Sequence, residues 1–333
     1  TMPGRGRTTL VSSTTLTLYG RAWGSAKRIF EGAESAEKPD VVLDNSGNVI
    51  VVWYQVDGTG VYSIYANRYL AGSGWGTPEV IENGSGVAYS PHIAMDSSGN
   101  AIVVWQQADG TGESSIYANR YVVGSGWGTA GLIEGGSGRA EFPQIAMDSS
   151  GNATVVWDQD DGTGVTSIYA NRYIVGSGWG TAISIESDAI DAIEPRIAVD
   201  GSGNAVAVWA EAEGTKESFH ANRYAAGSGW GAAKAIGAVT GYLNLHYQVA
   251  IDESGNAIAV WSQSTGTLNH IFANSYVLGT GWGIAQALEN ELYDAWAPRI
   301  ATDGLGNAIA VWYQGDGNKN HIWAKRYVYG FWE

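Results

Sequence analysis

Apolar side chains recur along the chain in short runs separated by turn residues, and these runs predict β-strands. Residues 167–175 (SIYANRYIV) alternate between core-type and solvent-type side chains, which is the period of a strand with one buried face. Residues 152–159 (NATVVWDQ) hold a nearly continuous apolar stretch, typical of a strand buried on both faces. No segment has the apolar spacing of a helix. The pattern therefore predicts an all-β protein.

One arrangement of strands and turns is repeated six times. The tryptophan that ends GNATVVW in residues 151–157 recurs, at intervals of 52 or 51 residues, as Trp53, Trp105, Trp157, Trp209, Trp261 and Trp312. Nine residues before each stands an aspartate: Asp44, Asp96, Asp148, Asp200, Asp252 and Asp303. In the third copy we expect a first strand at 143–148, a hairpin turn, a second strand at 152–159, a third at 167–175 and a fourth at 179–186.

The two ends of the chain carry complementary parts of one unit. The chain begins with a lone fourth-strand segment around Trp23 and ends after a third-strand segment. Pairing of these ends would leave no blade with an unpaired edge. We therefore expect a six-bladed β-propeller with four antiparallel strands per blade, closed by the N-terminal strand completing the C-terminal blade. Residues 1–20 are expected to form a tail and 21–333 a single domain.

Composition narrows the partners and the compartment. The 47 glycines and 15 tryptophans suit short strands and tight turns, and there is no cysteine for a disulfide or a thiolate site. A net charge of −15 argues against nucleic acid as a partner, and no apolar run is long enough to insert into a membrane. The first residues lack the apolar core of a signal peptide, so we expect a mature extracellular or periplasmic protein whose signal has been removed.

The copies differ most in the loops between the second and third strands and in those that lead into the next first strand. These loops fall on one face of an up-and-down propeller, and a rigid ring with one variable face suits ligand binding. The entries to the first strands converge on the central channel. The predicted ligand-binding residues at this channel mouth are Asp40, His92, Gln144, Glu194, Arg196, Gln248, Trp296 and Arg299.

Two repeated series are further candidates, because each side chain recurs in nearly every copy. A tryptophan follows the turn before the fourth strand and would offer a platform for sugar stacking: Trp75, Trp127, Trp179, Trp230 and Trp282. An arginine in the third strand would bind ligand oxygens: Arg68, Arg120, Arg172, Arg223 and Arg326. Packing at the rim for the tryptophans, and a salt bridge between blades or stacking on the nearby tryptophan for the arginines, are the structural alternatives.

Metal and cofactor sites are not expected. Each aspartate turn supplies one carboxylate, fewer ligands than a calcium loop needs, and the Asp side chain closes its own turn instead. The histidines have no zinc-like spacing, and no nucleotide-binding or hydrolase motif is present.

The DxxGNAxxVW, IYANRY and GWG segments resemble a repeat of uncharacterised exported bacterial β-propeller proteins, and the order of elements is similar to that of six-bladed fucose-binding lectins. The resemblance implies the fold, an exported location and sugar binding. Our first hypothesis is a secreted, lectin-like protein that binds glycans at repeated sites. The alternatives are an adhesive module that binds a cell-surface protein, and a polysaccharide hydrolase or lyase with one site at the channel mouth.

Overall fold

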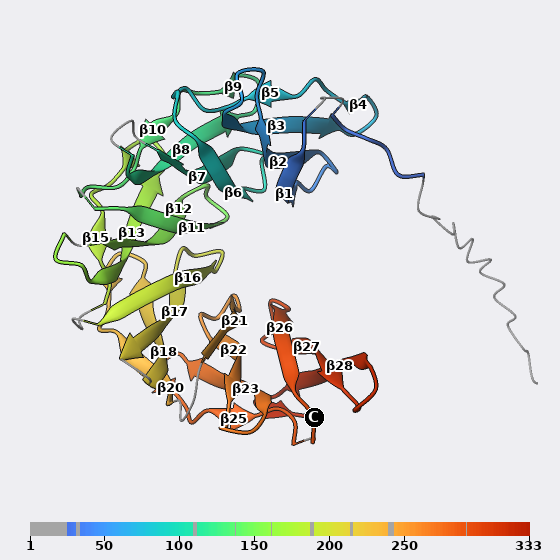
Figure 1. Ribbon diagram of the computed structural model, residues 1–333, viewed down its shortest axis with the longest axis vertical. Coiled ribbons are helices and arrows are strands. Elements are labelled where there is room, and N and C mark those ends of the chain that lie inside the picture. Colours follow the sequence, from blue (N-terminus) through green and yellow to red (C-terminus); the bar gives the residue numbers. More distant parts are fainter. Residues whose placement is uncertain are drawn as a thin grey trace, which may run out of the picture.

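The computed structural model describes residues 25–30, 34–108, 112–136, 138–160, 162–186, 190–213, 216–238, 243–290 and 292–333. All regular elements in these ranges are β-strands, and they form six antiparallel sheets that follow one another around a common centre (Figure 1). The predicted all-β class, the six units and their antiparallel order are confirmed.

Each sheet is built in chain order from the centre outward, and three long strands make up most of it. The first, innermost strands are β1 (Ala36–Leu43), β6 (Ala88–Met95), β11 (Ala140–Met147), β16 (Asp191–Val199), β21 (Leu243–Ile251) and β26 (Ala295–Thr302). The second strands are β2 (Val49–Val56), β7 (Ala101–Ala108), β12 (Ala153–Asp160), β17 (Ala205–Glu213), β22 (Ala257–Ser264) and β27 (Ala308–Gly315). The third strands are β3 (Tyr62–Leu70), β8 (Ser114–Val122), β13 (Thr166–Ile174), β18 (Lys216–Ala225), β23 (Asn269–Val277) and β28 (Asn320–Val328).

The outermost strand differs from the single strand that the sequence predicts, because it is divided into two short pieces. The pieces are β4 (Gly74–Trp75) and β5 (Glu79–Val80), β9 (Gly126–Trp127) and β10 (Gly131–Leu132), β14 (Gly178–Trp179) and β15 (Ile183–Ser184), β19 (Gly229–Trp230) and β20 (Lys234–Ala238), and β24 (Gly281–Trp282) and β25 (Gln286–Ala287). Both pieces pair with the same third strand. Within the described residues, the sixth sheet has only the first piece, β29 (Phe331–Trp332).

The repeated aspartate closes its own turn, as predicted. In the second copy, Oδ1 of Asp96 accepts the backbone N–H groups of Ser98 and Asn100, both at 2.9 Å, and Oδ2 accepts the Asn100 side-chain amide at 2.8 Å. Gly99 supplies the positive φ of +85° that the turn requires. The same three hydrogen bonds occur at Asp44, Asp148, Asp200, Asp252 and Asp303.

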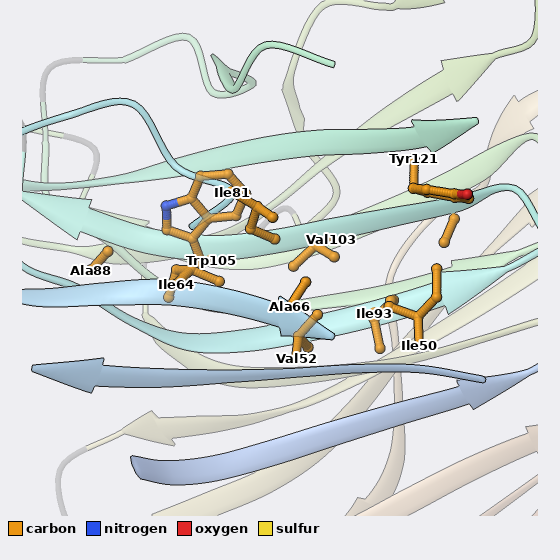
Figure 2. Close-up of a cluster of buried hydrophobic side chains, with 11 residues drawn as sticks. Ile50, Val52, Ile64, Ala66, Ile81, Ala88, Ile93, Val103, Trp105 and Tyr121 are labelled. Atoms are coloured by element: carbon orange, nitrogen blue, oxygen red, sulfur yellow. The ribbon is translucent and has the colours of Figure 1, made fainter. Parts of the chain in front are cut away.

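The hydrophobic core lies between neighbouring sheets. In Figure 2, Ile64 and Val52 of the first sheet face Trp105 and Val103 of the second, and all four are buried. The indole N–H of Trp105 donates to Oε1 of Gln107 at 2.9 Å, so its polar atom is satisfied inside the core. The predicted core role of this tryptophan series is confirmed, since none of its six members is more than 4% exposed.

Over the described residues, the six sheets form an arc that is open between the sixth sheet and the first. Each innermost strand packs against the innermost strand of the next sheet, from β1 to β26. A gap separates the sixth sheet from the first (Figure 1). The predicted tail at 1–20 and the closing strand around Trp23 lie outside the described residues, except that 25–30 are described. No helix in the described ranges is long and apolar enough to span a membrane.

Candidate functional site

A pocket of about 350 Å³ lies among the innermost strands of the first four sheets. Five of the eight predicted channel residues line it together: Asp40, His92, Gln144, Glu194 and Arg196. They come from β1, β6, β11 and β16, whose ends meet at the centre of the arc (Figure 1). We call this cavity the axial pocket.

A β-bulge in each of these strands places the pocket residues. The pairing of β11 with β12 shifts register between Glu141 and Gln144, and the intervening Phe142 has a φ of +51° and precedes Pro143. An extra residue in a bulge re-aims the side chains that follow it, and proline is tolerated there because it donates no ladder hydrogen bond. Lys38, Ser90 and Glu194 have the same left-handed backbone before a proline, and all line the pocket.

Asp40 and His92 contact each other at one side of the pocket. Oδ2 of Asp40 lies 3.3 Å from Nδ1 of His92 and accepts the backbone N–H of Ile93 at 3.0 Å. Burial alone would raise the pKa of Asp40, but the hydrogen bonds from His92 and Ile93 outweigh burial and lower it. The carboxylate is therefore charged at neutral pH and can accept a hydrogen bond from a ligand.

Arg196 is held at the other side. Its Nη1 donates to the carbonyl oxygens of Glu194 and Pro195, at 3.2 and 3.0 Å, and its Nη2 lies 3.5 Å from Oε2 of Glu194. The guanidinium also lies 5.5 Å from the ring centroid of Tyr247. Several contacts thus fix a planar donor whose side chain stays 28% exposed toward solvent.

Asp158, which is not among the residues predicted from the sequence, contacts the pocket wall from behind. Its Oδ2 accepts the backbone N–H of Glu194 at 2.9 Å, while only 5% of the residue is exposed. Burial raises the pKa of Asp158 to about 7, and Glu141 and Glu194 add to the rise, although the hydrogen bond from Glu194 opposes it. Its position offered a signal in the sequence, because the residue after the core tryptophan varies among the copies: Tyr54, Gln106, Asp158, Ala210, Ser262 and Tyr313.

The other predicted channel residues lie outside the pocket lining. Gln248 accepts the backbone N–H of Ile300 at 3.2 Å, which joins the fifth sheet to the sixth. Arg299 is exposed and donates to its neighbour Pro298 at 3.1 Å. Trp296 lines a separate cavity of about 480 Å³ with Tyr293 and Tyr313.

The repeated tryptophans and arginines meet on the same tyrosines. Trp127 packs edge-on against Tyr121 with ring centroids 5.4 Å apart, and the guanidinium of Arg68, from the preceding sheet, lies 4.1 Å from the same tyrosine. The equivalent tryptophan contacts involve Trp75, Trp179, Trp230 and Trp282, and the equivalent arginine contacts involve Arg120, Arg172 and Arg223. Arg326, at the open end, pairs with Glu333 at 3.3 Å. The tryptophans thus pack at the rim, and the arginines contact the next sheet through a tyrosine rather than through the salt bridge or the tryptophan that the sequence suggested.

Within the described residues, no group of three or more His, Asp or Glu side chains is arranged to hold a metal ion.

Comparisons with known proteins define the fold class. No family model and no curated protein matches the sequence. Among solved structures, an α-L-arabinanase of Penicillium chrysogenum in complex with arabinobiose is similar, with a TM-score of 0.52 and 11% identity over 87% of this chain and 92% of that one.

Sialidases are also similar. A Hadza microbial sialidase has a TM-score of 0.48 and 12% identity over 87% of this chain, which spans 65% of the sialidase. A leech intramolecular trans-sialidase has a TM-score of 0.49 and 10% identity over 92% of this chain and 70% of that one. At these identities, the likeness to the arabinanase supports a propeller-like fold and nothing further.

Proposed function

We propose that this chain is an extracellular or periplasmic carbohydrate-binding propeller whose ligand occupies the axial pocket. The observation that carries the proposal is the convergence of Asp40, His92, Gln144 and Arg196 from four sheets on one cavity. A cavity with a few convergent polar groups on a rigid scaffold is the usual form of a small-ligand site.

The chemistry of the pocket suits a sugar. The planar guanidinium of Arg196 and the carboxylate of Asp40 match the paired hydroxyl groups of a pyranose or furanose ring. Phe142, which is 41% exposed, offers an apolar surface for the C–H face of the ring. The arabinanase of similar fold was solved with a disaccharide, which makes plant and bacterial glycans the first library to test.

A glycan-array screen with two arginine variants tests the site. We expect specific binding that weakens by about tenfold or more in Arg196→Ala, because a charged hydrogen-bonding partner is lost. Arg120→Ala removes an arginine of the repeated series and should leave binding unchanged. Melting curves of both variants check that the fold is intact. Loss of binding in Arg120→Ala alone would instead favour the lectin hypothesis with repeated sites.

The raised pKa of Asp158 favours a second candidate, a polysaccharide hydrolase or lyase acting at the same pocket. A carboxyl group with a pKa of about 7 is partly protonated at neutral pH, as a general acid must be, and its hydrogen bond with Glu194 places it directly behind the pocket wall. The two functions separate on one measurement, the release of reducing or unsaturated sugar ends from a glycan that the protein binds. Turnover that disappears in Asp158→Asn would support the enzyme.

We also propose that the N-terminal strand closes the ring by completing the sixth sheet. The side-chain amide of Asn67 donates to the carbonyl oxygen of Ile29 at 2.9 Å. In the next sheet, Asn119 makes the same bond at 2.7 Å to Ile81, the residue that follows the outermost strand of the sheet before. Residues 27–30 therefore occupy the place where an outer strand from a preceding sheet would end.

The exposed surfaces at the two ends of the arc support closure. Ile322 on β28 is 79% exposed, whereas its equivalents Ile64, Ile116, Ile168, Phe219 and Ile271 are 0% exposed. On β1, Val41 is 59% exposed, whereas its equivalent Ile93 is 6% exposed. Joining the two ends would bury the apolar surface that the other five junctions already bury.

A further inference from the structure

Four of the junctions between sheets contain the same cationic contact. The third-strand arginine of one sheet reaches over the third-strand tyrosine of the next, with its guanidinium carbon 4.0 to 5.5 Å from the ring centroid. We call each such position an arginine slot. The four slots contain Arg68, Arg120, Arg172 and Arg223.

The third slot shows what surrounds the guanidinium. Nη1 of Arg172 donates to the carbonyl oxygen of Gly203 at 3.2 Å, and its guanidinium lies 4.0 Å from the ring centroid of Tyr224. A Cβ built on Gly203 would lie 2.8 Å from Oδ2 of Asp148 and 3.5 Å from Nη2 of Arg172, so the carboxylate and the guanidinium both lie near this turn. The slot thus combines an aromatic face, a carbonyl acceptor and a carboxylate.

The fifth junction keeps these surroundings but lacks the arginine. Ser275 stands at the arginine position, opposite Ile258 in the same register as Arg172 opposite Thr154. Tyr327, Gly306 and Asp252 correspond to the tyrosine, the glycine and the aspartate of the filled slot. A Cβ built on Gly306 would again lie 2.8 Å from Oδ2 of the aspartate, Asp252.

The space left by the missing side chain is a cavity of about 340 Å³ lined by Asp252, Ser275, Gly306 and Tyr327, among others. Among the described residues of the lining, Asp252 is the only charged one. Asp252 keeps its three turn-closing hydrogen bonds, but its negative charge and the aromatic face of Tyr327 still favour a positively charged guest in a slot without a cation.

We propose that this fifth slot is a binding site for the guanidinium group of a small organic molecule. Guanidinium is the group that the four equivalent slots contain, and its planar face suits stacking on Tyr327 while its N–H groups suit the Gly306 carbonyl. At the rim, Tyr329 and Leu305 are 91% and 89% exposed and offer apolar contact for the carbon chain of such a ligand. The site is independent of the axial pocket and of the proposed glycan.

Calorimetric titration with ethylguanidinium, at constant ionic strength, tests the slot. We expect one equivalent to bind to the wild-type chain and to Ser275→Ala, which keeps the cavity. Ser275→Arg supplies the guanidinium internally, so binding should weaken by at least about tenfold. Urea, a neutral molecule of similar shape, should not bind, because the interaction depends on the cation.

The reverse variant makes the test independent of residue 275. Arg223→Ser should open a second slot against Tyr276 and raise the stoichiometry from one to two equivalents. Absence of ethylguanidinium binding to the wild-type chain, or equal binding by Ser275→Ala and Ser275→Arg, would overturn the proposal. Circular dichroism of each variant at the ligand concentrations used confirms that unfolding by the guanidinium salt does not produce the heat.

Discussion

At the residue scale, the position after the core tryptophan holds a hydrogen-bond acceptor of the same role but different charge in the second and third copies. Gln106 accepts the backbone N–H of Phe142 at 3.1 Å, and Asp158 accepts that of Glu194 at 2.9 Å. Both acceptors are buried and both support a left-handed bulge residue of the next sheet. The Gln106 amide is neutral at any pH. Deprotonation of the Asp158 carboxyl, in contrast, places a negative charge in a buried site, which costs free energy.

Replacing Asp158 with Asn should therefore make stability less dependent on pH. The pKa of Asp158 is about 7 in the folded chain, above its usual value of 3.8, so the folded state binds the proton more tightly than the unfolded state. This group's contribution to stability is full below pH 3.8 and is lost as pH rises toward 7. Asn keeps the acceptor for Glu194 N–H and removes the ionisation.

Urea unfolding from pH 4 to pH 8 measures this effect. We expect the two proteins to be similar in stability near pH 4 and Asp158→Asn to gain with rising pH, by up to about 4 kcal/mol. Gln106→Glu is the matched control, because it places a carboxyl at the equivalent buried position and should lose stability over the same range. A difference between Asp158→Asn and wild type that stays constant with pH would contradict the assignment.

At the element scale, the innermost strands store backbone strain where they bend toward the axis. Lys38, Ser90, Phe142, Glu194 and Ala297 have φ between 45° and 54°, and each precedes a proline. Left-handed backbone costs an L-residue about 1 to 2 kcal/mol, so its recurrence in five strands requires that the bulge be held by other contacts. The hydrogen bonds from Phe142 and Glu194 to the preceding sheet supply such contacts.

Two alanines on β26 allow the strain to be measured. Ala297 has a φ of 50°, whereas Ala301 is not among the residues with positive φ. Ala→Gly removes the same methyl group and adds the same freedom to the unfolded chain at both positions. Ala297→Gly should therefore be more stable than Ala301→Gly by about 1 to 2 kcal/mol in urea unfolding. Equal losses at the two positions would show that the bulge is unstrained.

At the scale of the whole molecule, the repeat made the architecture predictable. The 52-residue spacing of the core tryptophans, the aspartate turns and the alternation in the third strands correspond to six antiparallel sheets. The residue pattern also predicted one continuous outer strand. In the third sheet, the backbone N–H of Gly180 donates to the carbonyl oxygen of Arg172, and pairing resumes only at Ile183 and Ser184. The outer strand is therefore divided into two pieces.

The candidate site was predictable only in part. Convergence of the first strands follows from the repeat, so Asp40, His92, Gln144 and Arg196 were found as a group. The bulge that aims them depends on hydrogen bonds between sheets, as does the burial that raises the pKa of Asp158. Such contacts between residues distant in the sequence leave no periodic signal. The vacant arginine slot is visible in the sequence, because Ser275 replaces the arginine of the other copies. Its importance becomes clear only from the structure, where the arginine of each filled slot contacts a tyrosine of the next sheet.

Closure of the ring is a property of the whole molecule, and a disulfide tests it directly because the chain has no cysteine. In the first sheet, Val80 of the outer strand pairs with Tyr65 of the third. The repeat places Arg28 and Trp323 in the equivalent positions of a closed sixth sheet. Arg28→Cys with Trp323→Cys should therefore form a bridge within one chain on mild oxidation, since cross-strand pairs lie within disulfide reach.

Trp323→Cys with Ile183→Cys, on the third sheet, is the control that should stay reduced. Mass spectrometry and non-reducing gels separate the outcomes: a bridge within the chain supports closure by its own strand. A bridge between two chains would assign the sixth sheet's edge to a second copy instead, and two free thiols would leave the arc open.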